Sequence, residues 1–240
     1  MITVKKNEQL FGHEKEYDAV IVTSDLYSVM QNGYSYFVGT MFPYAFDANM
    51  ATKYGDRRKL GTIIEAKQRG QPTFIFAFIL VHRMGGIYKD ESLSYEAVES
   101  CLKTINVLYK GKRIASMFIG ASDFDGRGNR RKLMRIFRRT TNDIDWTIYD
   151  GVQLSSTEMF FMMRKELKEL KEKDPDAYYR KNKKRKEIAK KIKAMNGRRG
   201  GIAYFEQVLK KQKEIIENEK KFKSKRRPPK DDSVLLPTGE

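Results

Sequence analysis

The stretch that most constrains the fold is residues 112–150, in which a strand, a loop, a helix and a second strand follow one another. Ile114–Ile119 form an apolar run, Gly120–Asn129 are small and acidic, Arg130–Arg139 form a basic amphipathic pattern, and Trp146–Tyr149 close the stretch. A strand–loop–helix unit places the N–H groups of a helix N-terminus beside the carboxyl end of a strand. The stretch therefore predicts an anion site at the edge of an open α/β sheet.

The upstream residues repeat this alternation of strands and helices. Apolar runs predict strands at Tyr17–Val22, Thr73–Val81, Leu60–Glu65 and Ile2–Val4. Helical spacing covers Ser94–Tyr109, which Gly111 ends, and Thr40–Thr52 is expected to be helical beyond Pro43. The segment 23–39 is polar, aromatic and glycine-containing, and no element is assigned to it. The alternation predicts an α/β layer fold with helices on both faces of the sheet.

After Gly151 the pattern changes to long helices. A helix opens at the capping-box pair Ser155 and Glu158 and is broken at Asp174-Pro175. A basic helix is expected over 181–195 and another over 203–222. We therefore expect a domain over 1–150, a basic helical extension over 151–222 and a disordered tail over 223–240. The helices of the extension either dock on the domain as a hairpin or form an arm that orders only on a partner.

Most of the positive charge lies in that extension. The chain carries a net charge of +17, with 22 Lys and Arg against 17 Asp and Glu in residues 1–150 and 26 against 14 in residues 151–240. Such asymmetry indicates a polyanionic partner. Nucleic acid or another polyanion, bound through residues 181–227, is the partner we expect for the extension.

Several classes of protein do not fit the sequence. A single cysteine, Cys101, excludes an internal disulfide framework and suits a reducing compartment, and its place on an apolar helical face indicates a buried residue. No apolar run approaches the ~18 residues that span a bilayer, so no membrane contact is expected. With two histidines and one cysteine, no zinc site and no cofactor are expected. We expect a soluble cytoplasmic protein. The Lys- and Met-rich tail suggests a viral (phage) or bacterial source, and a viral protein would act in the cytoplasm of the host.

Four segments of residues 1–150 resemble macrodomains, the α/β modules that bind ADP-ribose. They are Asp18–Val22, Met41–Gly61 (MFPYAFDANMATKYGDRRKLG), Ser94–Leu108, and Ile119–Ala121 together with Asp145–Tyr149. The likeness is to the subgroup of ADP-ribose-1''-phosphatase-like proteins and terminal ADP-ribose–protein glycohydrolases. It implies a three-layer α/β/α fold with a mixed central sheet, extended here by basic helices, and a site for ADP-ribose or a related nucleotide.

The resemblance also implies where the ligand lies. Two loops of the family approach the ribose and diphosphate, and their positions here are Gln31, Asn32 and Gly33 in the first loop and Gly120, Ala121, Ser122 and Phe124 in the second. Glu8 stands near the acid that receives the adenine amino group, although a solvated turn residue is as good an interpretation. The loops depart from the family pattern, because Gly33 is the one glycine left in the first and Ala121-Ser122 replaces glycines in the second.

Hydrolysis in this subgroup uses a lysine after the central strand and an acid in the second loop. Here His82 and Arg83 follow the central strand, and Asp123 and Asp125 lie in the second loop. Asp25 or Leu26 stands near the position of a family asparagine. A carboxyl group suits the proton transfer that glycosidic cleavage needs, and a histidine is a base near neutral pH. The structural alternatives are a helix cap for the acids and a hydrogen-bonded strand end for His82.

Two further groups have a functional and a structural interpretation. The basic face of the 130–139 helix, with Arg127 before it, either binds phosphate or nucleic acid or is a solvated face. Tyr34, Tyr36 and Phe37 either stack on a base or pack the core, and core packing is the favoured interpretation.

Two hypotheses follow. In the first, the chain recognises ADP-ribose or a related nucleotide, and hydrolysis of ADP-ribosyl or ADP-ribose-phosphate groups is a further step. In the second, it has kept the scaffold, has lost the ligand, and serves as a nucleic-acid-binding or assembly protein through its basic helices.

Overall fold

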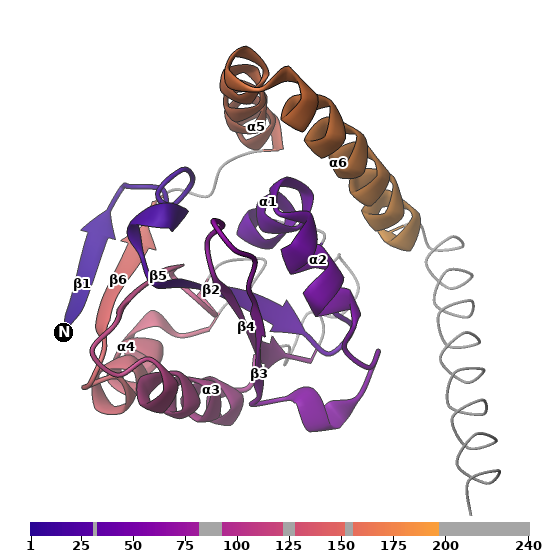
Figure 1. The fold of residues 1–240 in the computed structure, drawn as a ribbon. Coiled ribbons are helices and arrows are strands. Elements are labelled where there is room, and N and C mark those ends of the chain that lie inside the picture. Colours follow the sequence, from indigo (N-terminus) through magenta and orange to yellow (C-terminus); the bar gives the residue numbers. More distant parts are fainter. Residues whose placement is uncertain (31–32, 82–92, 122–127, 152–155, 197–240) are drawn as a thin grey trace, which may run out of the picture.

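The computed structural model describes residues 1–30, 33–81, 93–121, 128–151 and 156–196. Its centre is a six-stranded sheet with the order β1-β6-β5-β2-β4-β3 (Figure 1). The strands are β1 (Ile2–Lys6), β2 (Ala19–Asp25), β3 (Ile63–Ala66), β4 (Phe74–Leu80), β5 (Arg113–Met117) and β6 (Asp145–Asp150). All neighbouring strands pair in parallel except β3, which runs antiparallel to β4. The sheet is therefore mixed, with its antiparallel strand at one edge.

Helices cover both faces of this sheet. They are α1 (Gly33–Met41), α2 (Pro43–Met50), α3 (Tyr95–Leu108) and α4 (Arg130–Thr140), followed by α5 (Ser156–Lys173) and α6 (Pro175–Asn196). Figure 1 shows α3 and α4 together on one side of the sheet and α1 and α2 on the other. Two short 3-10 helices, η1 (Glu14–Glu16) and η2 (Arg57–Lys59), lie in the connections. The expected three-layer α/β/α architecture is confirmed.

Side chains of the central strands alternate between two hydrophobic clusters. Along β2, Val20 and Val22 join the cluster under α1 and α2, whereas Ala19 and Ile21 join the cluster under α3 and α4. Every residue of β2 and β4 is buried, which explains the continuous apolar sequence of β4 and the apolar first half of β2.

The helices α5 and α6 dock on the domain as a hairpin. Met163 and Leu167 of α5 and Ile188 and Ile192 of α6 are buried in the cluster of α1 and α2. Asp174 separates the two helices, and its carboxylate accepts the N–H of Ala177 at 2.9 Å, which caps α6. Of the two arrangements that the sequence left open, the described helices adopt the docked one. The expected helix over 203–222, the tail and Ser155 lie outside the described residues.

Three expectations need correction. The segment 23–39 was left without an element, whereas Gly33–Met41 form helix α1. Strand β2 reaches Asp25, three residues beyond the predicted end at Val22, and β5 ends at Met117 rather than Ile119. Gly111 has the expected left-handed backbone, at φ +72°. None of the helices among the described residues combines the length and the hydrophobicity of a transmembrane span.

Candidate functional site

The carboxyl ends of the five parallel strands meet at one edge of the sheet, which we call the carboxyl edge. β2 and β5 are neighbours in this sheet. The chain leaves β2 for α1 on one face and leaves β5 for α4 on the other. The two following loops therefore diverge at the carboxyl edge, and such a reversal of strand order is where open α/β sheets bind ligands.

Asp25 shapes the first of these loops. Its side chain is buried at the end of β2, and Oδ1 accepts the backbone N–H groups of Tyr27 at 2.8 Å and Val29 at 3.2 Å. Ser28, between them, has a positive φ of 56°. A carboxylate that holds two N–H groups of a tight turn fixes its backbone. Asp25 is thus an organiser of the first loop.

A polar cluster missed from the sequence lies under the same loop. Lys59 Nζ donates to Ser28 Oγ at 3.0 Å and Thr52 Oγ1 at 3.1 Å, and it lies 4.8 Å from the centre of the Phe78 ring. Asn49 donates to the Ser28 carbonyl at 3.1 Å. Burial lowers the pKa of Lys59 to about 8, and the nearby carboxylates of Asp25 and Asp56 oppose that shift.

Lys59 and Asn49 both come from the Met41–Gly61 segment that carries the family resemblance. No site residue was predicted in that segment, and the structure shows that it supports the first loop. The signal available in the sequence was Lys59 itself, which follows two arginines and precedes a leucine. Such a pattern is equally typical of a solvated turn.

The second loop is closed at its base by a backbone contact. Gly128 N–H donates to the Gly120 carbonyl at 2.8 Å, and a Cβ on Gly128 would lie 2.6 Å from that oxygen. Gly120 itself has φ +75°. Glycine is needed at 128 for the close approach and at 120 for the left-handed backbone. Ala121, the next residue, is partly exposed.

The second loop leads into the N-terminus of α4. Asn129 caps this helix by accepting the N–H of Lys132 at 3.0 Å, and its own N–H donates to the Tyr95 hydroxyl at 2.8 Å. Arg130 lies over the Phe118 ring, with its guanidinium carbon 4.1 Å from the ring centre, and forms an ion pair with Asp150 at the end of β6. Helix N–H groups and an exposed cation make this corner electropositive.

Glu8 lies at the same edge, just after β1. Its carboxylate is 56% exposed and pairs with Lys5 at 3.4 Å. A Cβ on Gly151 would lie 2.3 Å from the Glu8 carbonyl, so the chain segments that leave β1 and β6 are in close backbone contact. An exposed surface ion pair contributes little stability, which leaves the Glu8 carboxylate available for another partner.

Glu14 is a buried acid that the sequence did not mark. It accepts the Gly12 N–H at 2.9 Å and the Tyr34 hydroxyl at 3.1 Å. Burial raises its pKa to about 7 and raises the pKa of Tyr34 well above its usual value. In the sequence HEKEYD this residue resembles any solvated turn acid.

The structure places the predicted site residues as follows. Asp25, Gly33, Gly120, Ala121 and Glu8 all lie at the carboxyl edge. The remaining seven lie outside the described residues: His82, Asp123, Asp125, Gln31, Asn32, Ser122 and Phe124. Tyr34, Tyr36 and Phe37 pack against the cluster under α1 and α2, so they have the favoured core role.

Neither a metal centre nor a reactive thiol is found in the part of the chain that the structure describes. No three His, Cys, Asp or Glu side chains there are grouped to hold a metal ion. Cys101 is buried and donates to the Thr62 carbonyl at 3.2 Å, and burial raises its pKa to about 12. It is a structural residue of α3, as its position on the apolar face predicts.

Comparison with known proteins gives similarities of fold. No protein-family model matches the sequence, and no curated protein matches it significantly. Among solved structures, the chain is similar to the macrodomain of Thermus aquaticus DarG (16% identity, TM-score 0.49, 63% of this chain and 99% of that one). It is also similar to the macrodomain of Mycobacterium tuberculosis DarG (16% identity, TM-score 0.46, 63% of this chain and 99% of that one). A third similar structure is a protein of unknown function from Bacteroides thetaiotaomicron (18% identity, TM-score 0.49, 62% of this chain and 98% of that one).

Proposed function

We propose that this chain recognises ADP-ribose or a closely related nucleotide at the carboxyl edge of its sheet. The observation that carries the proposal is the divergence of the loops after β2 and β5 to helices on opposite faces. The sequence resemblance of residues 1–150 to macrodomains names the ligand class.

The residues at this edge supply the chemistry that a diphosphate nucleotide requires. The N-termini of α1 and α4 bring polarised N–H groups to the ends of the two loops. Arg130 adds a cation at the second of these. Glu8, exposed beside the end of β6, offers an acceptor for an adenine amino group. Phosphate oxygens need donors and an adenine amino group needs an acceptor, and the edge provides both.

Hydrolysis is a further step of the proposal. Cleavage of an ADP-ribosyl or ADP-ribose-phosphate group requires protonation of the leaving oxygen and deprotonation of an attacking water. We assign the acid–base role to Asp123 or Asp125, and a role as a base near neutral pH to His82. Asp25 is the remaining acid, and its two hydrogen bonds to the first loop support a structural role for it instead.

Isothermal titration calorimetry with ADP-ribose tests recognition separately from turnover. We expect one site per chain, weaker binding of ADP, and weaker binding still of adenosine, which lacks the diphosphate. No heat at millimolar ADP-ribose would contradict the proposal. Turnover is then followed by release of free ADP-ribose from an ADP-ribosylated protein and of phosphate from ADP-ribose-1''-phosphate.

A second function is favoured by the charge of α6. This helix carries nine Lys and Arg against two Asp and Glu. We propose that the extension, over residues 181–227, binds nucleic acid, either beside the nucleotide site or in place of it. Binding of nucleic acid that weakens steeply with salt, in a chain that gives no heat with ADP-ribose, would favour the second hypothesis alone. Both functions belong to a protein acting in the cytoplasm, of a host cell if the source is a virus.

A further inference from the structure

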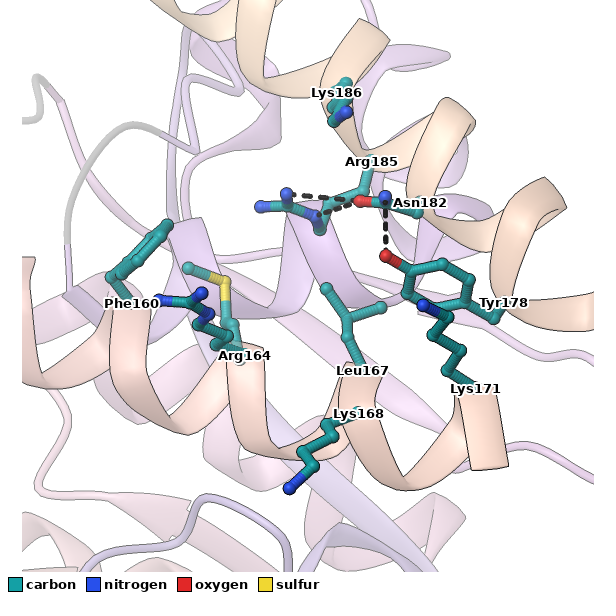
Figure 2. Close-up of a pocket in the computed structure, with 10 residues that line it drawn as sticks. Phe160, Arg164, Leu167, Lys168, Lys171, Tyr178, Asn182, Arg185 and Lys186 are labelled. Carbon is teal, nitrogen blue, oxygen red and sulfur yellow. Dashed lines mark hydrogen bonds between the residues drawn. The ribbon is translucent and has the colours of Figure 1, made fainter. Parts of the chain in front are cut away.

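A groove of about 510 Å³ runs between α5 and α6 (Figure 2). Its floor is apolar, because Met163 and Leu167 are 4% and 7% exposed at the contact with the domain. Phe160, which is 49% exposed, and Tyr178 add aromatic rings to its walls. A volume of this size is in the range that holds part of an extended ligand, since ligand pockets span roughly 300–1,000 Å³.

Among the described residues that line the groove, five are basic and none is acidic. The five basic side chains of the lining come from both helices: Arg164, Lys168 and Lys171 from α5, and Arg185 and Lys186 from α6. On α5 they lie on the stripe from Phe160 to Lys171, and the acids Glu166, Glu169 and Glu172 lie off it. The helix periodicity therefore separates the signs of charge and turns the positive side to the groove.

Two other cations of α6 already have ion-pair partners, one on α5 and one on the domain. Lys181 pairs with Glu166 at 3.1 Å, and Lys184 pairs with Asp47 of α2 at 3.0 Å. In contrast, none of the five groove cations forms an ion pair with another described residue. Five converging cations repel one another, and a bound polyanion relieves that repulsion.

One side of the groove is partly preorganised. Arg185 donates to Asn182 Oδ1 at 3.3 and 3.4 Å, and Asn182 donates to the Tyr178 hydroxyl at 3.3 Å, as the dashed lines in Figure 2 show. Lys171 lies 5.7 Å from the centre of the Tyr178 ring. Arg185 is thus linked through Asn182 to Tyr178, so that this side of the groove presents a guanidinium for phosphate and an aromatic ring for a base.

From these contacts we infer that the groove between α5 and α6 binds a single-stranded stretch of nucleic acid, with phosphates on its cations and bases against Phe160 and Tyr178. The inference rests on the second proposed function and names its site. A concave floor with aromatic walls reaches unstacked bases, whereas the bases of a duplex are stacked inside the helix. It is independent of the nucleotide site at the carboxyl edge.

The test is fluorescence anisotropy of the full chain with a labelled single-stranded oligouridylate, over a series of salt concentrations. The groove variant Lys168→Gln/Arg185→Gln removes one cation from each helix. The control variant Arg180→Gln/Lys191→Gln removes the same charge from exposed residues of α6 outside the groove lining. Circular dichroism and thermal melting confirm that both fold.

We expect the groove variant to bind about tenfold or more weakly near physiological salt. Its plot of log affinity against log salt should be shallower by about 1.4, since each phosphate contact on a single strand contributes ~0.7 to the slope. The control should change by less than about threefold. Equal losses in both variants would overturn the groove while leaving nucleic-acid binding, and absence of any binding would overturn both.

A second variant separates bases from charge. Phe160→Ala should weaken the binding of oligouridylate about fivefold or more, because stacking contributes ~1–3 kcal/mol per base. The same variant should leave the binding of inorganic polyphosphate unchanged. An equal loss of affinity for both ligands would contradict stacking of a base on Phe160.

Binding of phosphatidylserine vesicles without binding of the oligonucleotide would overturn the inference in favour of a lipid surface. If the groove variant fails to fold, photocrosslinking of a 4-thiouridine oligonucleotide to the unmodified chain should label residues 160–186, and labels confined elsewhere would overturn it.

Discussion

Single charged residues of the domain differ in whether their charge is exposed or buried. Glu8 and Arg130 are exposed and remain available to a ligand, whereas Asp25, Lys59 and Glu14 are wholly or partly buried in hydrogen-bonded settings. The sequence predicts the first kind because exposed charges are the rule. It did not predict the second kind, because burial of Glu14 arises from the packing of residues 10–16 on α1, which no local pattern encodes.

Glu14→Gln should stabilise the protein at high pH. The folded state raises the pKa of Glu14 from 4.5 to about 7, so it binds this proton more tightly than the unfolded chain does. In the unmodified chain, the stability that this bound proton contributes is fully present below pH ~4.5 and is lost as the pH rises through about 7, whereas a glutamine stays neutral at every pH. At pH 8 the variant should gain about 1–3 kcal/mol in urea unfolding, and at pH 4 it should gain little.

The control for this prediction is Glu169→Gln, which removes an exposed carboxylate of α5. Its stability should follow that of the unmodified chain at both pH values. An equal gain in the control at pH 8 would show that net charge, rather than burial of Glu14, is responsible.

Asp25→Asn separates a structural from a catalytic role. Both backbone bonds to the first loop go to a single oxygen, Oδ1, which an asparagine amide keeps. We expect Asp25→Asn to retain ADP-ribose binding within about threefold. Asp25→Ala leaves two N–H groups without their acceptor, and each lost hydrogen bond of this kind costs ~1–3 kcal/mol. The affinity of this variant for ADP-ribose should therefore fall at least tenfold.

Calorimetry gives both affinities, and a turnover assay on Asp25→Asn completes the test. Full affinity with abolished turnover would assign Asp25 to the chemistry. Full affinity with unchanged turnover, where turnover is detected, would leave it an organiser of the loop.

At the scale of elements, regular segments were predictable and the helix α1 was not. Strongly apolar β4 and the periodic α3 were located to within a residue or two, because period and burial coincide there. The sequence of α1, GYSYFVGTM, contains two glycines and many aromatic or β-branched residues, which disfavour a helix. Packing overrides this, since Phe37, Val38 and Met41 are buried and Gly39 allows Met30 to approach to 3.2 Å from where a Cβ would lie.

Arg130→Gln should weaken the binding of ligands that carry phosphate groups and leave the binding of other ligands almost unchanged. Arg130 is at the first position of α4, where its charge adds to that of the helix N-terminus. We expect about a fivefold to tenfold loss for ADP-ribose and ADP in calorimetry and almost none for adenosine. Arg138→Gln, at the exposed far end of the same helix, is the matched control and should bind as the unmodified chain does. Equal losses in the two variants would remove Arg130 from the site.

Leu167→Ala tests whether the helical hairpin is part of the folded unit. Leu167 is 7% exposed in the cluster shared with α1 and α2. Its truncation should lower the free energy of unfolding by about 2–4 kcal/mol in a single urea transition. Leu108→Ala, at a position 61% exposed, should change it by less than about 0.5 kcal/mol. A separate early transition in Leu167→Ala would show instead that the hairpin unfolds independently.

For the whole molecule, the α/β/α architecture was predictable because strand and helix patterns alternate along residues 1–150. The relation of that architecture to the basic extension was not, because four buried apolar residues spaced along α5 and α6 are too few to distinguish a docked hairpin from an arm. The result is a molecule with two electropositive regions, one at the carboxyl edge and one between α5 and α6.

The central claim is that the loops after β2 and β5 hold a nucleotide between them. A crystal structure of the chain soaked with saturating ADP-ribose tests this most directly. We predict density for the diphosphate between the N-termini of α1 and α4, with the adenine toward Glu8. A carboxyl edge filled by the chain's own side chains, with no ligand density there, would contradict it.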